Sequence, residues 1–154
     1  MMRDLAELNL NSPQARMKPT AKDFKKFEQE FEVILPTEYC QLLEFSNGGS
    51  LEIDSFVAKE GNPECSWSVN HFYHIAAEKG WDDLFTATRR FRARADVNTV
   101  PIAEDGGGNI IFLNYRHSTP TVCIWVHDEP KTIIKVASSF EAFIDSLQQN
   151  PDYI

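Results

Sequence analysis

The chain has 154 residues, with 15 Lys and Arg against 23 Asp and Glu, a formal net charge of −8. This length fits one domain with a core of its own. The acidic balance disfavours nucleic acid or an anionic membrane as partner and favours a basic protein surface, although net charge can also serve solubility alone. Neither a membrane-spanning apolar run nor a signal-peptide pattern is found, and three scattered cysteines do not form a disulfide framework. We therefore expect a cytoplasmic protein with reduced thiols.

Residues 1–19 are polar and weakly periodic, so they are predicted to form a loose lead-in to a single domain spanning 20–150. A first helix is expected after Thr20, with Asp23 as its capping-box partner. Four apolar residues at helical spacing should share its buried face: Phe24, Phe27, Phe31 and Ile34. Pro36 should end this helix and start a second one.

The second helix has an apolar stripe made of Tyr39, Leu42 and Leu43. The triplet Asn47-Gly48-Gly49 should end it, since these residues tolerate a left-handed backbone. Short strands are predicted at 51–53 and 66–69. A further helix is expected after Gly80, with acidic residues in its first turn and arginines near its end, as the helix dipole favours. These are Asp82 and Asp83, then Arg89, Arg90, Arg92 and Arg94.

Three apolar or alternating segments, 110–115, 121–127 and 132–136, are joined by short polar links and predict an antiparallel meander. Ser138 is the expected N-cap of a last helix, with Glu141 completing a capping box. The stripe that should place this helix on the sheet is Phe140, Phe143, Ile144 and Leu147. The expected fold class is α+β, an antiparallel meander sheet with two N-terminal helices and one C-terminal helix packed on one face.

The segment 101–109 contains three consecutive glycines, followed by the apolar run 110–113. A phosphate-binding loop needs glycines that open a helix and a Lys that meets the phosphate. Here the following residues predict a strand, no such Lys follows, and Glu104 and Asp105 would repel an anion. We interpret the segment as a tight acidic turn whose structural residues are Gly106, Gly107, Gly108 and Asn109.

Several motifs together resemble a known family. Leu35-Pro36-Thr37-Glu38-Tyr39 followed by Phe45-Ser46-Asn47-Gly48-Gly49 is similar to the first signature of the SUKH superfamily. Pro101-Ile102-Ala103 with Asp105-Gly106-Gly107-Gly108-Asn109 resembles its second signature, and Ser138–Phe143 resembles its closing helix. The similarity extends from Thr20 to Leu147 in the family's order, and residues 54–95 align with nothing. The superfamily includes fungal Smi/Knr cell-wall-assembly regulators and many bacterial immunity proteins.

The resemblance implies protein binding and no enzymatic activity. It favours an immunity protein that neutralises a cognate bacterial toxin, often a nuclease, by occluding its basic active site. An acidic inhibitor would be steered toward such a surface. The alternative is an intracellular regulatory scaffold of the same fold without a toxin partner. Residues expected to bind the partner are Glu52, Asp54, Trp67, Glu104 and Asp105.

Other chemistry is disfavoured by the residues themselves. His71 and His74 could bind zinc on one helix face, but their surroundings predict a strand, on which they would point apart, and a fourth ligand is missing. Asp105, Gly107 and Asn109 have calcium-loop spacing without the Gly and Glu that such a loop requires. We therefore expect no catalytic residue, metal or other cofactor, while an enzyme or metal protein built on these histidines or His127 stays an alternative.

Two further features admit more than one interpretation. His127, beside Asp128 and Glu129, is interpreted as part of a solvated hairpin tip, since acid–base catalysis needs facing side chains. The arginine cluster at 89–94 is interpreted as a solvated helix end or as an intramolecular partner for acidic loops. Trp67 and Trp81 are mainly expected in the core and are otherwise candidate partner anchors.

Overall fold

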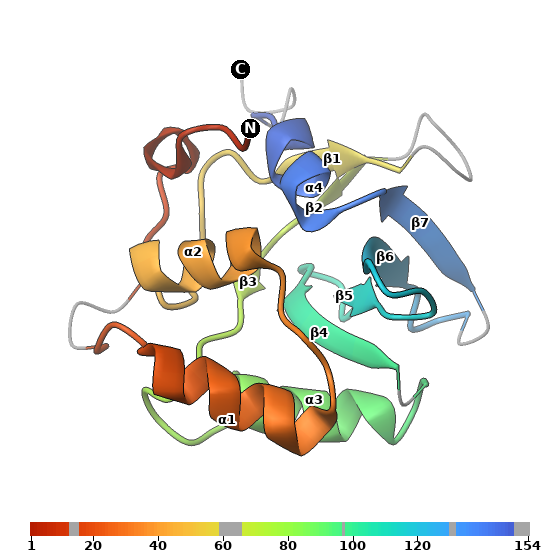
Figure 1. The fold of residues 1–154 in the computed structure, drawn as a ribbon. Coiled ribbons are helices and arrows are strands. Elements are labelled where there is room, and N and C mark those ends of the chain that lie inside the picture. Colours follow the sequence, from red (N-terminus) through yellow and green to blue (C-terminus); the bar gives the residue numbers. More distant parts are fainter. Residues whose placement is uncertain (13–15, 59–65, 97, 130–131, 150–154) are drawn as a thin grey trace.

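The computed structural model describes residues 1–12, 16–58, 66–96, 98–129 and 132–149. Its centre is a five-stranded antiparallel sheet in the order β3-β4-β5-β6-β7 (Figure 1). The strands are β3 (His71–Phe72), β4 (Thr99–Glu104), β5 (Ile110–Asn114), β6 (Thr121–Trp125) and β7 (Ile133–Ala137). Because neighbours in the sheet are neighbours in the chain, the predicted meander and the α+β class are confirmed.

A second, two-stranded sheet pairs β1 (Ser55–Val57) with β2 (Ser66–Ser68). The predicted strand at 66–69 is thus confirmed, while the one at 51–53 is wrong. The backbone amides of Glu52 and Ile53 both donate to the carbonyl of Leu8. These residues therefore bond to the N-terminal segment instead of pairing with another strand. That segment contains the 3-10 helix η1 (Leu5–Leu8), whose two leucines are buried.

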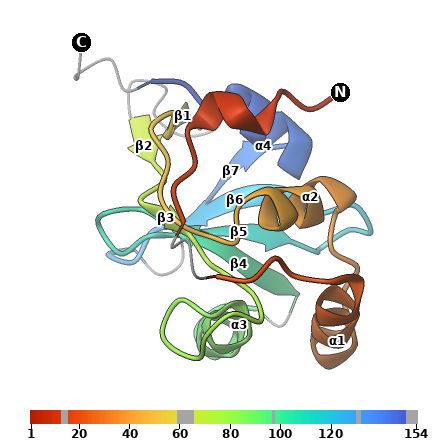
Figure 2. The same cartoon turned by 90° about the vertical axis from the view of Figure 1, so that its left-hand side faces the viewer.

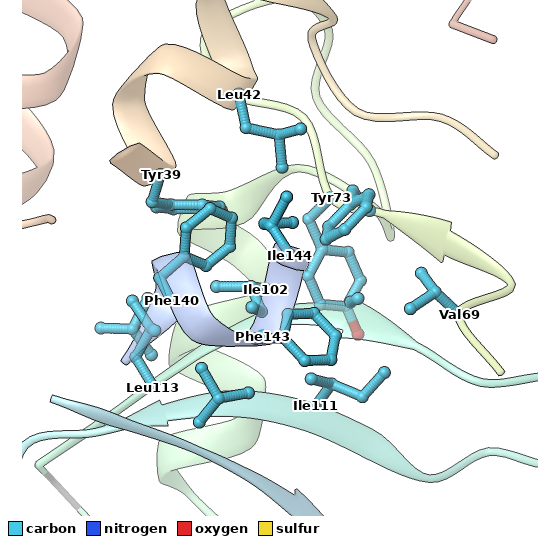
Figure 3. Packing of buried hydrophobic residues seen from close by; sticks show 14 of the residues in the cluster. Tyr39, Leu42, Val69, Tyr73, Ile102, Ile111, Leu113, Phe140, Phe143 and Ile144 are labelled. Carbon is cyan, nitrogen blue, oxygen red and sulfur yellow. The ribbon is translucent and has the colours of Figure 1, made fainter. Parts of the chain in front are cut away.

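Helices α2 (Thr37–Phe45) and α4 (Phe140–Ser146) cover one face of the large sheet, as expected (Figure 2). Figure 3 shows Phe140 and Phe143 of α4 above Ile111 and Leu113 of β5. The rings of Tyr39 and Phe140 meet edge to face at 5.2 Å, which joins the two helices. The N-cap of α4 is Ser139, not Ser138: its hydroxyl accepts a hydrogen bond from the amide of Ala142.

The opposite side of the sheet is covered by α3 (Leu84–Arg92), with α1 (Ala21–Phe31) beside it (Figure 2). The expectation of helices on one face therefore holds for α2 and α4 only. Phe91 of α3 lies against Phe112 and Trp125, both side chains that strands β5 and β6 direct to this face. α3 begins later than predicted, because Asp83 is its N-cap and not part of its first turn.

The first helix begins as predicted and ends earlier. Asp23 accepts hydrogen bonds from the amide and hydroxyl of Thr20. Glu32 takes a left-handed conformation, φ 56°, which ends α1. Ile34 lies beyond this end and is 77% exposed, so its predicted place on the buried face is wrong.

No helix among the described residues is both long and apolar enough to cross a bilayer. Cys40 is partly buried, and Cys123 is buried on the face of the sheet that α3 covers. Cys65 lies outside the described residues.

Candidate functional site

The first glycine turn, Asn47-Gly48-Gly49, is stabilised by hydrogen bonds of the buried Asn47 side chain. Asn47, which is 4% exposed, donates through its side-chain amide to the carbonyls of Met17 and Ile75 and accepts from the amide of Ile75. Gly48 has φ +78°, and a Cβ there would lie 2.9 Å from the carbonyl oxygen of Phe72. The Asn-Gly-Gly triplet thus attaches the end of α2 to the segment that follows β3.

The second glycine turn joins β4 to β5, so a strand follows the glycines and the expected turn geometry is observed. The carboxylate of Asp105 accepts hydrogen bonds from the amide of Gly107 at 2.9 Å and from the backbone and side-chain amides of Asn109 at 2.8 and 2.7 Å. Asn109 in turn accepts from the amide of His127 at 2.9 Å, which links this turn to the one after β6. The carboxylate of Asp105 is therefore engaged within its own turn.

Glu104 points away from these turn contacts, into a cluster with His71 and Asp82. The Nε2 atom of His71 lies 3.1 Å from a carboxylate oxygen of Asp82 and 3.3 Å from one of Glu104. The side chains of His71, Asp82 and Glu104 are 25%, 40% and 16% exposed, so the cluster faces solvent from a partly protected position. We call these three residues the acidic triad.

Three separate segments supply the acidic triad. His71 on β3 is the cross-strand partner of Glu104 at the end of β4, which places the two side chains on one face of the sheet. Asp82 precedes α3, and its carbonyl accepts a hydrogen bond from the amide of His74, which fixes this segment beside the end of β3. Folding therefore brings together residues that are far apart in sequence.

The electrostatics of the triad follow from these contacts. Hydrogen bonding to Glu104, aided by the charge of Asp82, raises the pKa of His71 above its ordinary value despite partial burial. The same bond lowers the pKa of Glu104. Among the described residues, no Lys or Arg forms an ion pair with either carboxylate. The charge of Arg90 also lowers the pKa of Glu104, so His71 and Arg90 together compensate part of the negative charge of the two carboxylates.

Trp81 stands next to the triad and is 62% exposed. The guanidinium of Arg90 lies 3.6 Å from the centroid of its ring and donates to its carbonyl at 3.0 Å. This cation–π contact orients a large exposed aromatic side chain beside Asp82. Of the two tryptophans considered from the sequence, Trp81 is the exposed one. Trp67 is half-buried against the core and lies opposite Phe56 in the small sheet.

Two other residues predicted to bind the partner lie apart from the triad. Glu52 is exposed, and its carboxylate accepts a hydrogen bond from the side chain of Asn9. The carboxylate of Asp54 accepts from the hydroxyl of Ser55. The backbone connects Asp54 to the triad, because Val69 donates to its carbonyl and the next residue, Asn70, donates to the carbonyl of Glu104.

Several other charged groups have partners within the chain. Arg89 forms a two-bond contact with Glu30, and Arg92 donates to the carbonyls of Phe31 and Thr99. These contacts agree with the intramolecular role considered for the arginine cluster. His127 forms an exposed pair with Asp128, at 2.9 Å, on the turn after β6.

Of the five residues predicted to bind a partner, only Glu104 belongs to the acidic triad. Asp82 was not predicted as a site residue, and His71 was considered only together with His74. No local pattern carries this information, since the cross-strand register of β3 and β4 creates the contact.

The fold and the charged end of its sheet define a small α+β domain suited to contacts with another macromolecule. The model of the SMI1 / KNR4 family (SUKH-1) matches residues 18–146, and the chain belongs to this family. The match confirms the resemblance seen in the signatures. None of the curated proteins compared with the chain matches it. Members of the family are generally non-enzymatic immunity proteins, and membership supports a protein-binding role of the immunity or regulatory type.

Proposed function

We propose that this chain is a cytoplasmic immunity protein that neutralises a cognate toxin by covering a basic surface at the toxin's active site. The observation that carries the proposal is the acidic triad beside Trp81. Its two carboxylates have no Lys or Arg ion-pair partner among the described residues, and an oriented aromatic side chain stands exposed next to them. Exposed Trp residues next to unsatisfied charge are typical of energetically dominant interface positions.

The mechanism is occlusion assisted by charge. The net charge of −8 steers the chain toward a basic partner, and salt weakens this steering. At contact, Asp82 and Glu104 pair with lysines or arginines of the toxin while Trp81 packs against its surface. A nuclease is a suitable toxin class, because its substrate-binding surface must be basic. Glu52, Asp54, Trp67 and Asp105 remain proposed as peripheral contacts, with Glu104 at the centre.

The test uses the product of the neighbouring gene as the candidate toxin, co-expressed and purified with the chain. We expect a tight complex whose association rate falls as salt rises. The double variant Asp82→Lys/Glu104→Lys should weaken binding at least about 100-fold, since it places like charges opposite the basic surface. Trp81→Ala should weaken it at least about tenfold.

The double variant Glu32→Lys/Glu44→Lys is the matched control, because it changes the net charge by the same amount at two exposed positions outside the triad. It should bind within a few-fold of wild type. Equal affinity of the double variant and wild type would reject the triad as the binding surface. If the neighbouring product binds without loss of its activity, the regulatory scaffold becomes the better description.

A further inference from the structure

The acidic triad has a second property, which competes with its pairing to a basic partner because both use the carboxylates of Asp82 and Glu104. Its three potential ligand atoms, one nitrogen and two carboxylate oxygens, all lie within 4.8 Å of one another. They come from β3, from the segment before α3 and from the end of β4, so each is held by a different part of the fold. Such convergence of a histidine and two carboxylates is a known ligand arrangement for divalent transition metals.

The spacing of the atoms fits a metal's coordination shell. Two ligands about 2.1 Å from a tetrahedral zinc ion are roughly 3.4 Å apart. The Nε2 atom of His71 lies 3.1 Å from the oxygen of Asp82 and 3.3 Å from that of Glu104. All three ligand atoms lie within 4.8 Å of one another, so binding one ion requires the widest pair to draw closer.

The surroundings of His71 supply the support that metal ligands have in proteins. Its other ring nitrogen, Nδ1, lies 3.0 Å from the side-chain nitrogen of Asn70. With a metal on Nε2, Nδ1 carries the proton, and a flip of the Asn70 amide presents its oxygen as the acceptor that orients the ring. Tyr73 packs edge-on to the imidazole at 5.9 Å and is fully buried. Tyr73 thus supports the imidazole from inside the core.

Charge also favours a dication. Neither carboxylate forms an ion pair with a Lys or Arg of the described residues, although the charge of Arg90 acts on Glu104. A divalent ion bound to a neutral imidazole and two carboxylates gives a net charge of zero. The imidazole ligand favours Zn²⁺ over Mg²⁺ or Ca²⁺, which prefer oxygen ligands only.

The geometry points to a divalent transition-metal site formed by His71, Asp82 and Glu104, with Zn²⁺ as the favoured ion and water at the remaining positions. His74, the partner considered from sequence, does not take part: its side chain is 3% exposed and its Nε2 atom lies nearest to Glu78, at 3.8 Å. The missing ligands come from the distant positions 82 and 104. The site needs no toxin, and its test is separate from that of the proposed function.

The experiment is calorimetric titration of the full chain with zinc chloride, after removal of metal with a chelator. We expect one Zn²⁺ per chain. His71→Gln, Asp82→Asn and Glu104→Gln should each weaken binding at least about tenfold, because each removes one of three protein ligands. His127→Gln is the matched control, since His127 also pairs with a carboxylate but has only two candidate ligands, and it should leave binding unchanged.

A second measurement does not depend on any variant. The ring nitrogen resonances of His71 should shift on addition of zinc and saturate at one equivalent, whereas those of His127 should not. Unshifted His71 resonances at saturating zinc would overturn the proposal, as would absence of binding to wild type. Undiminished binding to folded His71→Gln, or loss of binding in His127→Gln, would overturn it as well.

Discussion

The two glycine turns and the acidic triad use polar residues in opposite ways. In the turns, the side chains of Asn47, Asp105 and Asn109 are saturated by hydrogen bonds to nearby backbone groups. In the triad, two carboxylates share a single imidazole and keep part of their surface in solvent. The comparison teaches that the signature residues Asn47, Asp105 and Asn109 hold the fold together, whereas two of the three triad residues, His71 and Asp82, come from the segment that no signature covers.

The largest expected effect concerns the first turn. Asn47→Ala should lower the free energy of unfolding by about 3 kcal/mol, because two backbone carbonyls and one amide in a buried region lose their partner at about 1 kcal/mol each. Urea denaturation followed by tryptophan fluorescence measures this loss. The control Asn98→Ala, at an exposed position, should stay within about 0.5 kcal/mol of wild type. A loss in Asn47→Ala no larger than in the control would contradict the structural role of this turn.

An intermediate effect is expected in the second turn. Asp105→Ala should cost about 1–2 kcal/mol of unfolding free energy, since three N–H groups lose their acceptor and the turn is partly exposed. Asp105→Asn keeps an acceptor oxygen and should recover about half of the loss. Thermal denaturation of both variants measures the difference. Equal stability of Asp105→Ala and wild type would show that the hydrogen bonds of the Asp105 carboxylate do not stabilise the turn.

The smallest stability effect is expected at the triad. The double variant Asp82→Asn/Glu104→Gln should change the unfolding free energy by less than about 1 kcal/mol in buffer with a chelator, because partly exposed ion pairs contribute little. Urea denaturation measures it. A loss of unfolding free energy as large as that of Asn47→Ala would show that the triad stabilises the fold as much as the turns do.

Much of the fold follows from local sequence pattern. The helices around Phe27, Leu42 and Phe143 and the strands of the meander are predicted by apolar periodicity, because each pattern is local and neighbours in the sheet are neighbours in the chain. Ile34 was misplaced because the left-handed residue Glu32 ends α1 before the periodic pattern ends. The strand at 51–53 was misplaced because its amides bind the distant carbonyl of Leu8.

The candidate site was much less accessible to prediction. Glu104 was predicted as a site residue because it adjoins the glycine turn. The sequence around His71 contains no pattern that predicts its contact with Glu104 or Asp82. Their meeting depends on the register between β3 and β4 and on the bond that holds Asp82 to His74. Both are long-range contacts, and they are set by how the sheet assembles.

The short β3 strand has a consequence for the order of folding. Hairpins β4–β5, β5–β6 and β6–β7 close small loops, whereas pairing of β3 with β4 closes the long loop between positions 71 and 104 and costs more chain entropy. We therefore expect this end of the sheet to form late, after the meander is complete. A newly synthesised chain would then assemble the acidic triad only once the meander is in place.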